Sequence, residues 1–247
     1  MVRRGSNATG MERDLSVGTV FSAAFSAFAA RARVLVPIVF FSSLVVSAIS
    51  RLLGPEGIGF LVGWVVDAAF FALVQAVAMT VLRDLRERRP ASSIGDLLAT
   101  ALPPLPAATL VGVLALAAVT VALVFLIVPG LYLMTIWAVV LPVAVVERPG
   151  VFDAFGRSRG LVRGNGWKVL GVVLLLGLLL AVSAALALLL HRHAAGPVVS
   201  ILFGSLLSSV IAPIQMLVLG VLYFRLLDIE RERPAESVLE QPGDSAS

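Results

Sequence analysis

Long apolar runs recur six times along the chain, each near the length of a membrane-spanning helix. A hydrocarbon core about 30 Å thick needs roughly 20 apolar residues of helix. The runs do not alternate apolar and polar positions as the strands of a membrane barrel do, and only a helix satisfies its backbone within one apolar segment. The pattern predicts an all-α, polytopic bundle of six transmembrane helices, at residues 34–53, 58–82, about 107–128, 131–146, 169–190 and 198–224.

Three shorter segments, near residues 16–33, 92–102 and 150–164, each precede a pair of these runs and have one apolar side. In the second, Ser93 and Asp96 have the spacing of a capping box before apolar residues at helical intervals. Each pair of runs also ends in a Glu-Arg-Pro or Glu-Arg-Arg-Pro sequence. We therefore expect three parallel units, each an interfacial helix followed by a helical hairpin.

The segment 17–30 permits three interpretations. Ala27-Phe28-Ala29 resembles a signal-peptidase site after an arginine-bearing arm, and the run could also form a seventh span. We favour an interfacial helix that is capped by Ser16 and that places Phe21, Phe25 and Phe28 on one apolar stripe. The chain then divides into a disordered arm (1–15), a membrane domain (16–227) and a disordered tail (228–247).

The distribution of charge predicts the orientation. The chain is 59% hydrophobic and 14% charged, with a formal net charge of +4, and of its 19 basic residues only Arg51 and Arg192 fall on the side opposite the others. The positive-inside rule then places both termini in the cytoplasm. Because arginine far outnumbers lysine and alanine is abundant, we expect the inner membrane of a bacterium with a GC-rich genome.

Composition also narrows the chemistry. There is no cysteine, and the two histidines are His191 and His193, which leaves no ligand set for a typical zinc site. The spans contain no Ser–His, Ser–Lys or His–carboxylate arrangement that would indicate a membrane-embedded hydrolase. We therefore expect no metal, no cofactor, no enzymatic activity and no nucleic-acid partner.

Three residues predict local breaks in the helices. Pro129-Gly130 predicts a tight turn between spans three and four, which would leave almost no external loop. Pro142 predicts a kink in span four that frees the carbonyl of Ala138 or Val139 for another partner.

Polar residues inside the spans are few. Asp67 lies about a third to halfway along span two, where a charge costs about 3 kcal/mol. Gln75 in span two and Gln215 in span six are candidates for hydrogen bonds between helices. One interpretation makes Asp67 a proton- or cation-coupling site of a small transporter or channel, with Gln75 along its path; the other makes these residues structural.

Basic residues beside the third interfacial segment form the favoured candidate site. Each such residue contributes about 1 kcal/mol near an anionic leaflet. We therefore expect a lipid-interacting or complex-organising protein that binds anionic lipids, with a possible protein partner at the cytoplasmic face. Its oligomeric state stays open. The expected head-group contacts are Arg157, Arg159, Arg163 and Lys168.

The stretch from residue 128 to residue 170 contains the pattern A-x-x-R-S-x-x-L-x-x-G-x-x-W. By this pattern it resembles a family of bacterial polytopic proteins named after the membrane domain of glycerophosphoryl diester phosphodiesterases, but Arg225 stands where the family's ending has an aspartate. The resemblance implies a six-helix membrane domain and does not imply catalysis, because the cytoplasmic segments are far too short for the family's catalytic barrel. The matching residues are Ala154, Arg157, Ser158, Leu161, Gly164 and Trp167.

Overall fold

The computed structural model describes residues 15–54, 56–193 and 196–239, and within these ranges it contains helices and no strand. Six segments are long and apolar enough to cross a membrane, with the two short helices α6 and α7 together forming the fourth. The all-α, six-span prediction is therefore confirmed. The helices are α2 (Val17–Leu53), α3 (Gly57–Arg86), α4 (Ile94–Ala101), α5 (Leu105–Phe125), α6 (Ile127–Ile136), α7 (Val140–Val146), α8 (Val151–Val162), α9 (Gly166–His193) and α10 (Pro197–Leu239).

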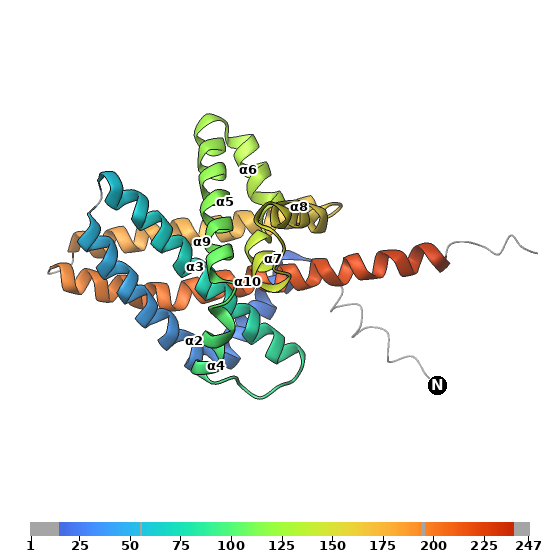
Figure 1. The fold of residues 1–247 in the computed structure, drawn as a ribbon, viewed down its shortest axis with the longest axis horizontal. Helices are drawn as coiled ribbons and strands as arrows, with labels where there is room; N and C mark the ends of the chain where they lie inside the picture. Colours follow the sequence, from blue (N-terminus) through green and yellow to red (C-terminus); the bar gives the residue numbers. More distant parts are fainter. Residues whose placement is uncertain (1–14, 55, 194–195, 240–247) are drawn as a thin grey trace, which may run out of the picture.

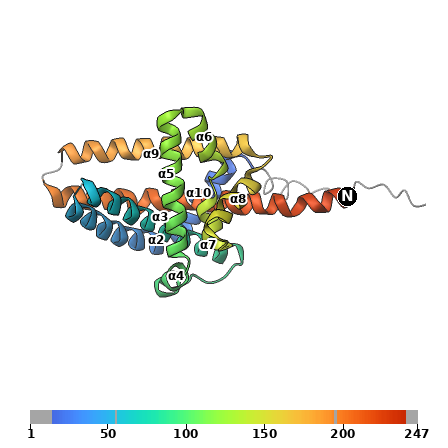
Figure 2. The same cartoon turned by 45° about the horizontal axis from the view of Figure 1, so that its top comes forward.

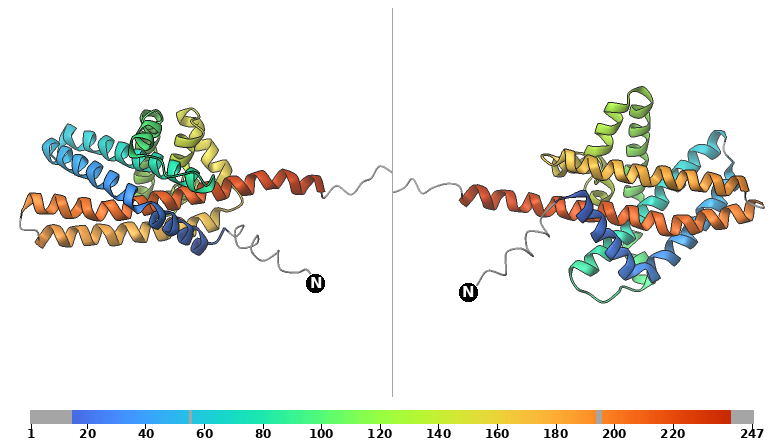
Figure 3. Two further views of the ribbon diagram at one scale, coloured as in Figure 1. Left: turned by 90° about the horizontal axis from the view of Figure 1, so that it is seen from below. Right: turned by 180° about the vertical axis from the view of Figure 1, so that it is seen from behind.

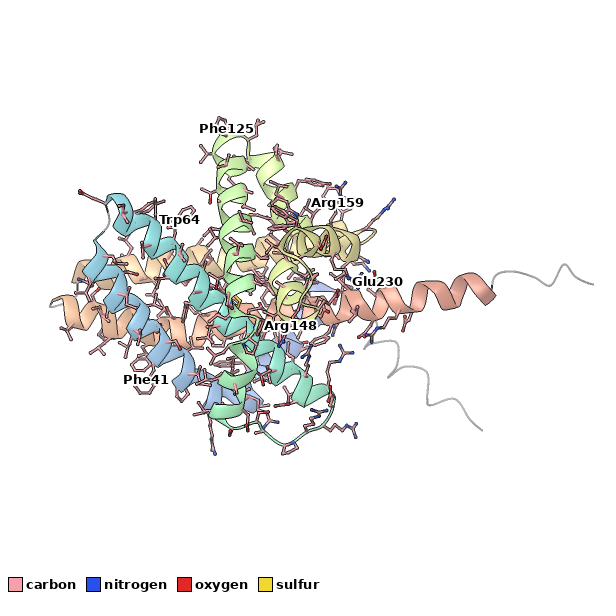
Figure 4. The ribbon with its side chains drawn as sticks, in the orientation of Figure 1. Phe41, Trp64, Phe125, Arg148, Arg159 and Glu230 are labelled. Atoms are coloured by element: carbon pink, nitrogen blue, oxygen red, sulfur yellow. The ribbon has the colours of Figure 1, made fainter. Side chains whose placement is uncertain are left out.

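The spans form three hairpins that cross one another. In Figures 1 and 2 the α5–α6 hairpin stands across the direction of α9 and α10, and in Figure 1 the α2–α3 hairpin runs diagonally between the two directions. The order of elements matches the three predicted units, but the hairpins differ in build because only span four is broken. Figure 4 labels Arg148, Arg159 and Glu230 on the side away from Trp64 and Phe125. We call that side of the molecule the basic end.

The first predicted interfacial helix is not a separate element. The side chain of Ser16 caps α2 as expected, accepting a hydrogen bond from the Thr19 backbone nitrogen at 3.3 Å. The helix then continues without a break to Leu53 and contains Pro37, and Figure 3 shows it bending between its dark-blue and lighter-blue parts. A proline that removes one backbone hydrogen bond bends a helix without ending it. Residues 1–14 of the predicted arm lie outside the described ranges.

The other two short helices form as predicted. Both halves of the capping box at α4 are present, since the Ser93 side chain accepts from the Asp96 nitrogen and the Asp96 carboxylate accepts from the Ser93 nitrogen. The Ser93 hydroxyl also donates to the Asp96 carboxylate at 2.7 Å, and this bond, followed by the one from the Ser93 backbone nitrogen, holds the pKa of Asp96 below its usual value. In α8 the predicted inner side is buried, with Ala154 and Ser158 almost fully covered. Each helix packs by its apolar side, with Leu97 and Ala101 of α4 and Leu161 and Val162 of α8 buried.

The prediction of a turn at Pro129-Gly130 was wrong. The chain reverses at Leu126, the one residue between α5 and α6, whereas Pro129 and Gly130 lie in the first turn of α6. Proline is tolerated there because the first backbone nitrogens of a helix have no partner within the helix. Gly130 is buried and lets the two helices meet closely, because a Cβ atom there would lie 2.8 Å from the Leu123 backbone nitrogen.

Span four is interrupted near Pro142, but the carbonyl that takes an outside partner is not one of those predicted. The helix stops after Ile136 and restarts at Val140, so that Pro142 falls in the first turn of α7. Since the Val140 nitrogen bonds to the Trp137 oxygen, the Ile136 oxygen is released from the helical pattern. It accepts a hydrogen bond from the buried Ser158 hydroxyl of α8 at 2.9 Å. The break therefore attaches α8 to span four.

Spans two and six form the centre of the packing. Gly220 of α10 faces Leu82 and Met79 of α3 so closely that a Cβ atom would lie 2.5 Å and 2.9 Å from them. A small residue at such a position lets two membrane helices approach each other. The Gln75 side chain adds a long hydrogen bond, 3.4 Å, to the Met216 carbonyl.

Two of the three Glu-Arg-Pro or Glu-Arg-Arg-Pro sequences end a helix, and the third does not. Arg88 after α3 and Arg148 after α7 both have a left-handed backbone, with φ of 53° and 50°, and each directly follows a glutamate. This repeated local structure supports an internal relation between the first two units. The third copy lies inside α10, which continues to Leu239, so the prediction of disorder from residue 228 was wrong as far as residue 239. Residues 240–247 lie outside the described ranges.

Candidate functional site

A network of charged side chains joins α7, α8 and α10 at the basic end. Arg157 donates to Glu147 at 2.8 Å and binds both carboxylate oxygens of Glu230, at 2.6 Å and 2.7 Å. The Tyr223 hydroxyl donates to the other oxygen of Glu147 at 2.9 Å. The hydrogen bonds from Arg157 to Glu230, together with the single one to Glu147, raise the pKa of Arg157 above its usual value. Two-pronged pairing of this kind is stronger than a single ionic contact.

This network changes the role expected for Arg157. Its side chain is 31% exposed and already pairs with two carboxylates, so its charge is compensated within the protein. These ion pairs join α8 to α7 and to the part of α10 that lies beyond residue 228.

A cavity of about 560 Å³ opens beside this network, between the ends of α3, α7 and α10. All four of its carboxylates already accept from an arginine: Arg157 serves two, Arg86 binds Asp228 at 2.9 Å, and Arg89 binds Glu87 at 2.7 Å. Arg86 also lies 4.6 Å from the ring centre of Phe224. The cavity is lined by Arg83, Arg86, Glu87, Val146, Glu147, Arg157, Tyr223, Phe224, Leu227, Asp228, Glu230 and Arg231.

The outer side of α8 and the start of α9 carry exposed aromatic and basic side chains together. Phe152 is 81% exposed and Trp167 is 87% exposed. Arg159 and Lys168 are also exposed, and Figure 4 shows Arg159 pointing away from the body of the molecule. We call these four residues the α8 face. Arg163, which ends α8, is exposed as well.

The structure does not bring the three intramembrane polar residues into one path. Asp67 is exposed on α3, whereas Gln75 is fully buried between α3 and α10. Gln215 is 9% exposed and lines a separate, mostly apolar cavity of about 350 Å³ between α3, α5, α7, α9 and α10. With about 1.5 Å of rise per residue and a core of about 30 Å ending at Arg83, Asp67 lies roughly 6 Å inside the far boundary.

Several residues of the site were not predicted from the sequence to be functional. Glu147 and Tyr223 stood in recognisable motifs, but nothing in their spacing indicated that they bind each other across 76 positions of the chain. Glu230 was assigned to the tail, and Arg83 was counted only as a charge that sets topology. In the described part of the chain, no three His, Asp or Glu side chains come together as they would to hold a metal ion.

The fold and this distribution of charge define an integral membrane protein of the all-α class. Comparison with protein-family models, curated proteins and solved structures finds no match for the chain.

Proposed function

We propose that this is a non-enzymatic, multi-pass protein of the bacterial cell membrane that holds anionic lipids at its cytoplasmic side through the α8 face. The observation that carries this proposal is the joint exposure of Phe152 and Trp167 beside Arg159 and Lys168. Aromatic rings favour the membrane–water boundary, and basic residues there attract anionic head groups. A water-soluble surface rarely leaves two large aromatic rings this exposed.

The same surface offers a route to organise a partner complex, since a helix bound at the lipid boundary leaves its charged margin open to the cytoplasm. The transporter alternative has less support. Asp67 is exposed on α3 whereas Gln75 is buried, and the cavity that Gln215 lines includes neither of them.

We also propose membership of the family named after the phosphodiesterase membrane domain. Three of the signature residues make structural contacts in this chain, which supports the proposal. Arg157 forms the ion-pair network, the Ser158 hydroxyl binds the Ile136 carbonyl of span four, and Leu161 is buried.

The lipid proposal is tested by exchanging single arginines. Arg159→Gln should weaken binding of phosphatidylglycerol to the purified protein about fivefold, because one basic residue near an anionic surface contributes about 1 kcal/mol. Adding Lys168→Gln should bring the loss to roughly 30-fold. The measurement is titration of short-chain phosphatidylglycerol against the protein in neutral detergent, followed by native mass spectrometry.

The matched control is Arg51→Gln, which removes the same charge from an exposed position at the far end of α2. It should leave phosphatidylglycerol binding within twofold of the wild type. If Arg51→Gln and Arg159→Gln weaken binding equally, the α8 face is not the lipid site.

A further inference from the structure

Within the described residues, the charged cavity at the ends of α3, α7 and α10 contains more arginines than its ion pairs use. Arg83 is half-buried and lines the cavity. Among the described residues no carboxylate lies within ion-pair distance of Arg83, and none lies that close to Arg231 at the rim. Burying part of a guanidinium without a hydrogen-bond acceptor carries a free-energy cost. Such a group needs water or an anion in the space beside it.

The carboxylates of the cavity cannot fill this role without leaving their present partners. Glu147 is held by Arg157 and Tyr223, Asp228 by Arg86, and Glu87 by Arg89. The lining holds four arginines and four acids, so its own formal charges cancel. Because Arg89 from outside the lining neutralises Glu87, one positive charge remains in excess around the cavity. This residual charge selects an anion, and not a cation or a zwitterion, as the occupant.

Size and shape narrow the chemistry further. A volume of about 560 Å³ falls within the range of about 300–1,000 Å³ that is usual for small-molecule sites. Planar guanidinium groups bind carboxylate or phosphate oxygens in pairs, and they bind phosphate where two or more of them converge. Arg86 is also fixed in place by Asp228 and the Phe224 ring, which prepares this wall of the cavity before any ligand arrives.

We propose that this cavity binds a phosphate group, with Arg83 as its principal ligand and Arg86 and Arg231 at its margin. The phosphate can reach the cavity on a lipid head group from the adjacent leaflet or on a soluble compound from the aqueous side. Because the cavity lies at the ends of membrane helices, both sources are at the right depth. The inference extends the proposed function and can fail separately from it, since Arg83 is not part of the α8 face.

The test is a titration of the full-length protein in neutral detergent, with binding measured by calorimetry and by the shift in melting temperature. Three probes separate the sources: inorganic phosphate, glycerol 3-phosphate and dihexanoyl phosphatidic acid. Wild-type protein should bind at least one of them. Arg83→Gln should weaken that binding at least tenfold, because two charge-assisted hydrogen bonds are lost. Arg83→Lys keeps the positive charge but lacks the paired donors of a guanidinium, so it should bind the same probe more tightly than Arg83→Gln and less tightly than the wild type.

The matched control is Arg88→Gln, which removes an exposed charge five residues away that does not line the cavity. Tighter binding of phosphatidic acid than of glycerol 3-phosphate identifies the lipid as the source, and equal binding identifies the soluble group. The proposal is overturned if wild-type protein binds none of the probes, or if Arg83→Gln and Arg88→Gln bind them equally. Unchanged phosphatidylglycerol binding by Arg83→Gln leaves the α8 face proposal standing.

Discussion

Replacing Arg157 by glutamine should destabilise the folded protein by about 2 kcal/mol, the usual effect of removing hydrogen bonds from charged groups that are only partly exposed. Arg157 makes contacts to Glu147 of α7 and Glu230 of α10, and its loss leaves two carboxylates facing each other without a cation. The end of α10 should then detach from α8. The check is thermal unfolding in detergent, together with hydrogen exchange of the amides from residue 226 to residue 239.

Arg159→Gln serves as the control, since it changes the same residue type on the same helix at an exposed position. It should leave the melting temperature and the exchange of α10 unchanged. A second variant, Arg157→Gln with Glu230→Gln, should recover part of the stability because it removes one of the unpaired carboxylates. If Arg157→Gln unfolds at the wild-type temperature, the network does not hold α8 to α10.

The substitution Gly130→Ala should also destabilise the protein, by about 2 kcal/mol, although alanine favours a helix by about 1 kcal/mol relative to glycine. The added methyl group would lie 2.5 Å from two side-chain carbons of Leu123 and 2.8 Å from its backbone nitrogen. A backbone atom cannot rotate aside as a side chain can, so α6 must move away from α5. Thermal unfolding in detergent measures the loss.

Gly204→Ala provides the opposite expectation. Gly204 lies inside α10 with no atom within 4 Å of the position a Cβ would take, so alanine should leave stability unchanged or raise it slightly through helix propensity. Of the two variants, only Gly130→Ala should therefore lower the melting temperature. Equal shifts would mean that α5 and α6 are not in close contact at Gly130.

Sequence patterns were sufficient for the spans and the short helices because both depend on local periodicity. Ser16 and Ser93 cap their helices as expected, and Ala154 and Ser158 occupy the inner side of α8. Contacts between distant segments gave no such signal. Arg157 was predicted to contact lipid head groups because it lies among basic residues beside an interfacial helix, and the sequence did not indicate its ion pair with Glu230, 73 residues further on.

Local signals also misplaced the turn after span three. Pro129-Gly130 has the composition of a turn, yet Leu126 makes the reversal and the glycine serves the contact with Leu123. Proline in the first turn of a helix and proline in a turn have the same torsion angle, so sequence alone does not separate them. The crossing of the hairpins had no signal in the sequence, because it depends on which faces of the spans meet.

The reversal between α5 and α6 has a consequence for how the protein meets the membrane. Its residues are all apolar, with Phe125 and Val128 each 78% exposed, and both backbone groups of Leu126 are used within the hairpin. Pro129 removes one more donor. A helix reversal whose backbone groups have partners within the protein, and whose side chains are apolar, is stable in hydrocarbon. With 21 residues, α5 is about 32 Å long, close to the thickness of a hydrocarbon core of about 30 Å. Even a modest tilt of α5 therefore leaves this apolar tip inside the hydrocarbon, where a polar loop would not be stable.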